Sequence, residues 1–175
     1  DDALFMSRNN IEYVELISDD GKSKVMVIPA WQGRVMTTSA AGDEGDSYGW
    51  INYSFIKKRQ IDLQFNPVGG EERFWLGPEG GVFSLYFRQG EKQIYKNWKV
   101  PPVLDIEAFK IQSQSKNCIC LTKEGCLTNA CGTTFYLNIK RTISLLDINE
   151  FAASFNLEFP KDIKAVAYKS DNQIT

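Results

Sequence analysis

The stretch of sequence with the most evident chemistry is residues 66–81, which read NPVGGEERFWLGPEGG. It holds five glycines, three glutamates, one arginine and two large aromatic residues in 16 positions. Glycines let a backbone approach another group closely, and the two prolines stiffen the loop. Carboxylates and a guanidinium form charge-assisted hydrogen bonds with hydroxyl groups, and Phe74 and Trp75 offer flat apolar faces for a pyranose ring. The residue types in this segment therefore point to sugar recognition.

A purely structural role for the same segment is a serious alternative. Phe74 and Trp75 can belong to the core, Arg73 can pair with Glu71 or Glu79, and the glycines can do no more than shape turns. A phosphate-binding loop fits poorly, because the Lys-Ser/Thr ending is missing and three acidic residues would repel a phosphate.

Six residues are the candidates for a substrate-binding face: Arg34, Asn66, Glu71, Arg73, Trp75 and Glu79. The two arginines would donate hydrogen bonds to sugar oxygens, and the glutamates would accept them from vicinal hydroxyls. We expect Arg73 and Glu79 to converge on a concave surface. No metal or cofactor is predicted. The catalytic residues of an enzymatic function stay unidentified, because the sequence contains no histidine, the usual acid or base near neutral pH. A carboxyl with a raised pKa would have to replace it.

Composition narrows the classes of partner. The 20 basic and 22 acidic residues give a formal net charge of −2, so the chain carries no electrostatic signature of binding to nucleic acid or to an anionic membrane. The apolar runs are far shorter than the roughly 20 residues of a membrane-spanning helix. The first residues lack the basic and apolar blocks of a secretory signal, so any such signal has been removed or never existed.

Apolar and polar residues alternate with a period of two, the pattern of strands with one buried face. The strands are expected at residues 11–17, 25–28, 82–87, 106–111, 118–121, 133–139, 143–145, 153–159 and 163–168. Short helices are possible only at residues 56–63 and 148–155, and a hairpin turn is expected at residues 19–22. This pattern predicts one all-β domain over residues 1–175, an antiparallel β-sandwich.

The cysteines and the tryptophans leave alternatives open. Cys118, Cys120, Cys126 and Cys131 fit buried free thiols best, with a Cys126–Cys131 disulfide as the main alternative and a metal site disfavoured by the spacing. Trp31, Trp50 and Trp98 fall outside the strand pattern, so each is either a ligand-stacking residue or part of the rim packing, with Trp50 the strongest candidate for ligand contact.

Several motifs together resemble those of a known superfamily. These are residues 33–38 (GRVMTT), 47–52 (SYGWIN) and 69–81 (GGEERFWLGPEGG), followed by shorter matches at 127–133 and 141–143. In order and spacing they resemble a branch of secreted bacterial proteins with the galactose mutarotase-like fold, over about residues 11–175. The long Gly-Trp motif is the specific part of the match.

The resemblance implies a β-supersandwich that binds a sugar on a concave sheet face, in an extracytoplasmic location. It also implies that the chain corresponds to the N-terminal part of a larger domain. The histidine acid of the aldose 1-epimerases has no counterpart here, and their glutamate base lies in the later half of the domain, so catalysis cannot be transferred.

Three functions follow as hypotheses. The first is a carbohydrate-binding protein of galactose mutarotase-like type, with epimerase activity possible in a full-length form. The second is a non-catalytic module that binds a glycan or a protein. The third is a glycoside-processing enzyme with paired carboxylates, which requires carboxyl groups about 5–9.5 Å apart.

Overall fold

Two antiparallel sheets form the framework of the protein. The structure, a computed structural model, describes residues 1–160 and 162–175. The smaller sheet has the order β1-β2-β3 and the larger sheet the order β4-β5-β6-β7. The strands are β1 (Val14–Ile17), β2 (Lys24–Ile28), β3 (Arg34–Ser39), β4 (Lys110–Gln114), β5 (Cys118–Thr128), β6 (Thr134–Leu145) and β7 (Tyr168–Ile174). The prediction of an all-β fold built from packed antiparallel sheets is confirmed.

Helices are short and peripheral. They are α1 (Asp2–Arg8), α2 (Tyr53–Lys58) and α3 (Ile148–Ser154). The side chain of Asn52 caps α2 and that of Asp147 caps α3, each accepting hydrogen bonds from backbone amides of the first turn. No helix in the described ranges has both the length and the apolar character needed to cross a membrane.

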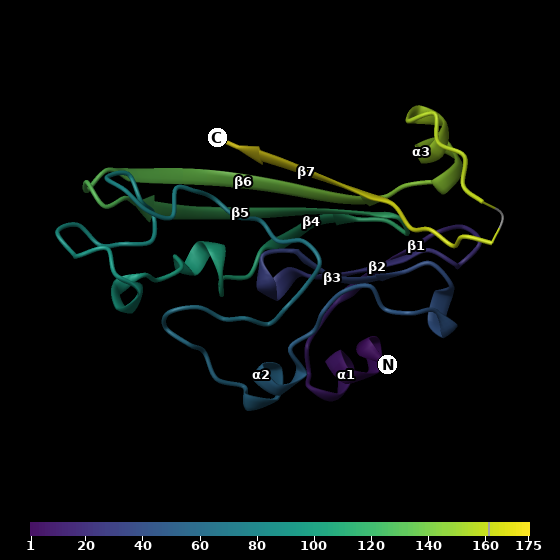
Figure 1. The fold of residues 1–175 in the computed structure, drawn as a ribbon, viewed down its shortest axis with the longest axis horizontal. Coiled ribbons are helices and arrows are strands. Elements are labelled where there is room, and N and C mark those ends of the chain that lie inside the picture. Colours follow the sequence, from purple (N-terminus) through teal and green to yellow (C-terminus); the bar gives the residue numbers. More distant parts are fainter. Residues whose placement is uncertain (161) are drawn as a thin grey trace.

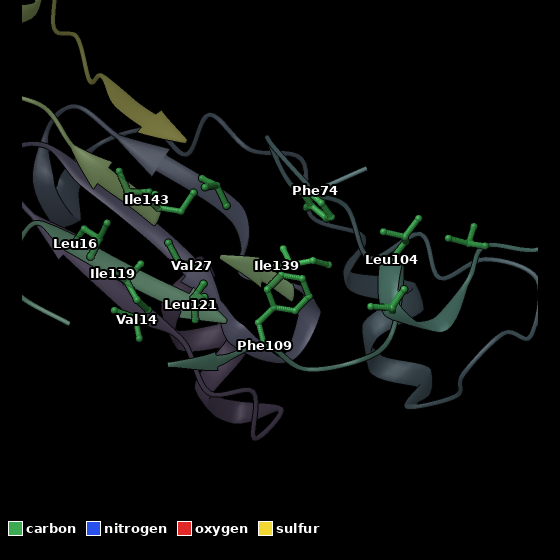
Figure 2. Close-up of a cluster of buried hydrophobic side chains, with 14 of the residues drawn as sticks. Val14, Leu16, Val27, Phe74, Leu104, Phe109, Ile119, Leu121, Ile139 and Ile143 are labelled. Atoms are coloured by element: carbon green, nitrogen blue, oxygen red, sulfur yellow. The ribbon is translucent and has the colours of Figure 1, made fainter. Parts of the chain in front are cut away.

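The main core lies between the two sheets. Alternate residues of β2, Val25 and Val27, point into it and are fully buried. Figure 2 shows how Val27 of the small sheet faces Ile119, Leu121 and Ile143 of the large sheet. The opposite face of β2 is buried as well, because its other alternate residues pack with side chains from α1 and α2 in a second cluster. The small sheet is therefore covered on both faces.

The large sheet is much longer than the small one. Strands β5 and β6 pair continuously from Cys118↔Ser144 to Thr128↔Thr134. In Figure 1 the small sheet lies against one half of this ribbon, and the irregular segment between α2 and β4 lies against the other half. Buried side chains of that segment, including Tyr86 and Leu104, join the same core cluster as Leu127 of β5. Residues 59–109 thus act as the second cover of the large sheet without forming a strand of a sheet.

Within residues 59–109, one predicted strand is wrong and another is wrong in its first residues, because this segment packs on the large sheet without pairing. Residues 82–87 form turns and bends, and residues 106–109 precede β4 instead of starting it. Apolar residues at these positions pack against the large sheet through side chains, which mimics the alternation of a strand. The strand β3 was missed, because its burial on both faces removes the alternation of apolar and polar residues.

The end of the chain also differs from prediction. Residues 153–159 contain the end of α3 followed by irregular backbone, so the short helix that was possible at residues 148–155 is present and the strand predicted at 153–159 is wrong. Strand β7 runs through residues 170–173, which have the composition of a turn. The helix α1 was not predicted, and α2 overlaps the possible range of 56–63 only at residues 56–58. The hairpin predicted at residues 19–22 joins β1 to β2 and is confirmed.

Candidate functional site

The Gly-Trp segment, residues 66–81, divides into two parts with different surroundings. Its first part runs beside β3, where Glu72 forms an antiparallel bridge with Val35 and Gly69 forms one with Ile51. Its second part leaves this edge and enters a group of aromatic side chains in the irregular segment. The first part therefore contacts the edge of the small sheet and the loop before α2 through single bridges, and the second part builds a surface.

The charged side chains of Arg73 in this segment and of Arg34 in β3 are directed into the protein interior. Arg34 is 2% exposed and donates a hydrogen bond from Nη1 to the carbonyl oxygen of Gly69 at 2.7 Å. Arg73 donates to the carbonyl oxygen of Leu104 and approaches Asp105 Oδ1 at 3.4 Å. Gln32 Oε1 accepts from both guanidinium groups, at 3.3 Å from Arg34 and 3.5 Å from Arg73. We call this group of side chains the interior charge network.

Asp105 holds the network to residue 66. Its Oδ2 atom accepts hydrogen bonds from the backbone amide of Asn66 at 2.9 Å and from Asn66 Nδ2 at 2.7 Å. Burial raises the pKa of Asp105 above its ordinary value, although the hydrogen bonds from Asn66 and the charge of Arg73 oppose the shift. Burial also lowers the pKa of Arg34 to about 10, with the like charge of Arg73 acting in the same direction.

Asp105 is a carboxyl of the kind that acid catalysis without histidine requires. It borders a pocket of about 320 Å³ whose lining also includes Trp31, Phe55 and Ile106. Both carboxyl oxygens already accept hydrogen bonds from Asn66 and Arg73. Because protein donors already occupy both oxygens, the geometry favours a structural role for Asp105.

Two further acidic residues of the segment also serve the framework. Glu71 Oε1 accepts hydrogen bonds from the backbone amide and the hydroxyl group of Thr38, each at 2.9 Å. Glu72 pairs with Arg141, a fully buried arginine of β6. Arg141 also donates to the carbonyl oxygen of Gly33 at 3.1 Å, so this side chain connects the large sheet to the turn before β3.

The second part of the segment contributes to a column of aromatic rings. The guanidinium carbon of Arg73 lies 4.1 Å from the ring centre of Trp75. Trp75 packs on Tyr86 with ring centres 5.2 Å apart, and Tyr86 stacks on Trp98 at 5.6 Å with an angle of 7°. Trp98 in turn stacks on Tyr95 at 6.3 Å and 12°. The column begins in the interior charge network and ends at the surface.

The outer end of the column forms an open hollow of about 530 Å³, which we call the aromatic hollow. Its lining residues are Glu79, Gly80, Phe87, Gln93, Ile94, Tyr95 and Trp98. Tyr95 is 77% exposed, so the ring face that does not contact Trp98 is open to solvent. Glu79 Oε1 accepts a hydrogen bond from the indole nitrogen of Trp75 at 2.9 Å, which orients the carboxylate beside the rings.

Hydrogen bonds hold the loop that carries Tyr95. The Gln93 side chain accepts from the backbone amide of Gly81 and donates to its carbonyl oxygen, both at 2.7 Å. Gln64 Nε2 donates to the backbone carbonyl of Tyr95 at 2.6 Å. These contacts and the ring stacking restrict the position of the exposed ring before any ligand arrives, a property that lowers the entropic cost of binding.

The six predicted site residues therefore fall into separate environments. Trp75 and Glu79 belong to the column and the aromatic hollow, and Arg73 lies against the inner face of Trp75. Arg34 and Asn66 are buried, with their hydrogen bonds directed to protein groups, and Glu71 is bound to Thr38. Arg73 and Glu79 both contact Trp75, but they do not converge on one concave surface, because the Arg73 guanidinium is directed to Leu104 and Asp105 while Glu79 lines the aromatic hollow.

Tyr95 and Gln93 line the aromatic hollow but are not among the six predicted site residues. They lie in the run QIYKNW, whose aromatic residues are three positions apart, so that a single 3-10 turn places both rings on one side. Trp98 was one of three tryptophans considered for ligand contact, and it lines the aromatic hollow, whereas Trp31 borders the pocket near Asp105. Trp50, the strongest sequence candidate, is 64% exposed elsewhere on the surface.

The cysteines are free thiols in the structure, as the leading prediction stated. Burial is confirmed only for Cys120, because Cys118 is half-buried and Cys126 and Cys131 are exposed. The alternative bridge between Cys126 and Cys131 is not formed. Cys131 Sγ donates to Asn129 Oδ1 at 3.0 Å within the β5–β6 hairpin.

Another hollow, of about 710 Å³, lies on the large sheet, where its lining includes Lys110, Glu124, Lys140 and Gln173. Of the described residues that line it, none is aromatic, so it lacks a stacking surface for a sugar ring. The aromatic hollow is thus the better candidate for a functional site.

Comparison with known proteins gives a family but no activity. No curated protein and no solved structure matches the chain. The model of one family, described as a family of unknown function (DUF6786), matches residues 1–175. Because this match extends over the full 175 residues, the chain belongs to the DUF6786 family.

Proposed function

We propose that the protein binds carbohydrate at the aromatic hollow. The observation that carries this proposal is the stacked Tyr95–Trp98 pair, which presents an open ring face within a hollow that also contains the Glu79 carboxylate. A pyranose has an apolar face of C–H groups and a rim of hydroxyl groups. An aromatic face next to a hydrogen-bond acceptor matches both features of this ligand.

The packing beneath the Tyr95 ring, which we call the aromatic platform, favours binding by a preformed site. Four rings in succession, Trp75, Tyr86, Trp98 and Tyr95, connect the surface to the core, and Arg73 covers the inner end. Residues fixed in this way by packing lose little conformational entropy when a ligand binds. The resemblance to galactose mutarotase-like proteins points to the same class of ligand, although the six residues first considered contribute only in part.

The residues of the aromatic hollow favour sugar binding without catalysis. A glycosidase with paired carboxylates requires two carboxyl groups that face each other across the sugar. Of the described residues that line the aromatic hollow, one carries a carboxylate, Glu79, and it accepts a hydrogen bond from the Trp75 indole. This arrangement suits hydrogen bonding to a sugar hydroxyl.

Replacement of Tyr95 tests the proposal. We expect Tyr95→Ala to weaken binding to the best ligand from a glycan array by about tenfold, because an exposed aromatic anchor of an interface typically contributes at least this much. The ring is mostly solvent-exposed, so thermal stability should change little. Affinity is measured by titration calorimetry and stability by thermal unfolding.

Tyr136→Ala is the matched control, because Tyr136 is 83% exposed on β6 and does not line the aromatic hollow. It should bind like the wild type. The proposal fails if no glycan is retained by the wild type, or if the Tyr95 and Tyr136 variants lose affinity equally.

A further inference from the structure

A second hollow adjoins the aromatic hollow, and its chemistry is different. It has a volume of about 490 Å³ and is lined by residues of the irregular segment and of β5. We call it the basic hollow, and its lining includes Leu63, Tyr86, Phe87, Arg88, Gln89, Asn97, Lys99, Pro101, Cys126 and Asn129. Phe87 lines both hollows, and Asn97 of the basic hollow precedes Trp98 of the aromatic hollow. The two hollows therefore meet at one shared wall.

The basic hollow carries uncompensated positive charge. Arg88 and Lys99 are exposed in its lining, and none of the described residues that line it is acidic. Within residues 1–160 and 162–175, neither side chain forms an ion pair. The surrounding residues 85–101 contain four basic residues and one acidic residue, whereas the whole chain has a net charge of −2. Positive charge is thus concentrated beside the aromatic platform.

Neutral donors and acceptors complete this lining. The side-chain amides of Gln89 and Asn97 lie in it together with the two cations. A guanidinium binds a carboxylate or a sulfate through two parallel hydrogen bonds, and an ammonium adds a point charge. Amides can bind the hydroxyl groups of the same sugar unit. This set of groups matches a sugar that carries an anionic substituent.

We infer that the ligand is an acidic oligosaccharide that spans both hollows. One sugar ring stacks on Tyr95 in the aromatic hollow, and a unit bearing a carboxylate or a sulfate ester binds Arg88 and Lys99 in the basic hollow. This inference rests on the proposed function, because it needs a sugar on the aromatic platform. Glu79 lies on the aromatic side, so the anionic unit is directed away from it and toward the cations.

The test compares three oligosaccharides of similar length by titration calorimetry at low salt. They are an oligogalacturonate, a chondroitin sulfate oligosaccharide and uncharged cellopentaose. We expect at least one acidic ligand to bind about tenfold more tightly than the neutral one, because hydrogen bonds to charged groups are stronger than neutral ones. The preference should fall as salt is raised, since exposed charges are screened. The two acidic ligands distinguish a uronate from a sulfate ester.

Charge-removing variants test whether Arg88 and Lys99 cause the preference for an acidic ligand. The double variant Arg88→Gln/Lys99→Gln should lose the preference for the acidic ligand while it keeps its affinity for the neutral one. The control Lys110→Gln/Lys140→Gln removes the same charge from the hollow on the large sheet and should behave like the wild type. The inference is overturned if acidic and neutral ligands bind equally, or if the control loses the preference and the Arg88/Lys99 variant keeps it.

The outcomes separate this inference from the proposed function. If acidic and neutral ligands bind equally and this binding depends on Tyr95, the inference of an acidic ligand is wrong, but the proposal of carbohydrate binding stands. Failure of every oligosaccharide to bind the wild type would refute both.

Discussion

Replacement of Arg141 with alanine should lower the free energy of unfolding by about 3–5 kcal/mol, the cost typical of breaking a buried ion pair. Arg141 is fully buried and donates hydrogen bonds to Glu72, to the carbonyl oxygen of Gly33, and to Ser170 and Asn172 of β7. Its removal leaves Glu72 without its cation. The carbonyl oxygen of Gly33 and the side-chain oxygens of Ser170 and Asn172 lose the hydrogen bonds that Arg141 donates. The loss therefore affects both sheets and the Gly-Trp segment together.

Urea unfolding, followed by circular dichroism, measures this change. Lys140→Ala removes the same charge from the neighbouring exposed position on β6 and should shift the unfolding free energy by less than about 0.5 kcal/mol. In the Arg141→Ala background, a further Glu72→Ala change should cost less than it does in the wild type, because the two side chains interact directly. A loss below about 1 kcal/mol for Arg141→Ala would contradict the structural role of this residue.

The second large effect is expected for Gly69→Ala. Gly69 has a φ of +98°, and a Cβ atom there would lie 2.2 Å from the backbone oxygen of Trp50. An alanine would incur about 1–2 kcal/mol for the left-handed backbone. It would incur about 1–3 kcal/mol more for the clash, because the backbone of Trp50 cannot move without breaking the bridge between Ile51 and Gly69.

Gly81→Ala separates the two contributions. Gly81 has a φ of +84°, but no atom lies within 4 Å of the position that its Cβ would occupy. This control should show only the backbone cost, about 1–2 kcal/mol. Thermal and urea unfolding of both variants provide the comparison, and equal losses at the two glycines would mean that the close approach to Trp50 contributes nothing.

These two effects concern residues whose types suggested a ligand site. Glu72 and Gly69 lie in the Gly-Trp segment, yet their closest contacts are with β3, β6 and the loop before α2. The partners of the segment's charged residues are distant in the sequence: Asp105 for Arg73 and Arg141 for Glu72. No local pattern indicates such pairs, so the sequence alone could not show that Arg34, Asn66 and Glu71 would be directed inward.

The sequence predicts the fold correctly where the alternation of apolar and polar residues and a local turn determine the structure. The first hairpin has one face of β1 buried and a glycine-containing turn, and both signals are local. Strands β5 and β6 were recognised in fragments, because polar and exposed positions interrupt the apolar alternation between residues 121 and 143. Their continuous pairing extends the sheet through these positions.

The failures have physical causes as well. Strand β7 has the polar sequence YKSDNQI, and it forms because its backbone pairs with β6 from Tyr168↔Leu145 to Ile174↔Ile139. The residues 82–87 alternate like a strand, but they contact the core through Tyr86 and Phe87 without pairing. A long irregular segment that covers half of a sheet is unusual, and such segments commonly carry binding residues.

The indole N–H signals of the four tryptophans give the most direct test of carbohydrate binding at the aromatic hollow. Trp98 lines the hollow and Trp75 donates its indole hydrogen to Glu79, whereas Trp31 and Trp50 lie outside the hollow. The signals are assigned in ¹H–¹⁵N spectra from single Trp→Phe variants, and the wild type is then titrated with the tightest oligosaccharide. We expect the signals of Trp75 and Trp98 to shift while those of Trp31 and Trp50 stay in place. Shifts confined to Trp31 or Trp50, or no shift of any indole signal at saturation, would contradict it.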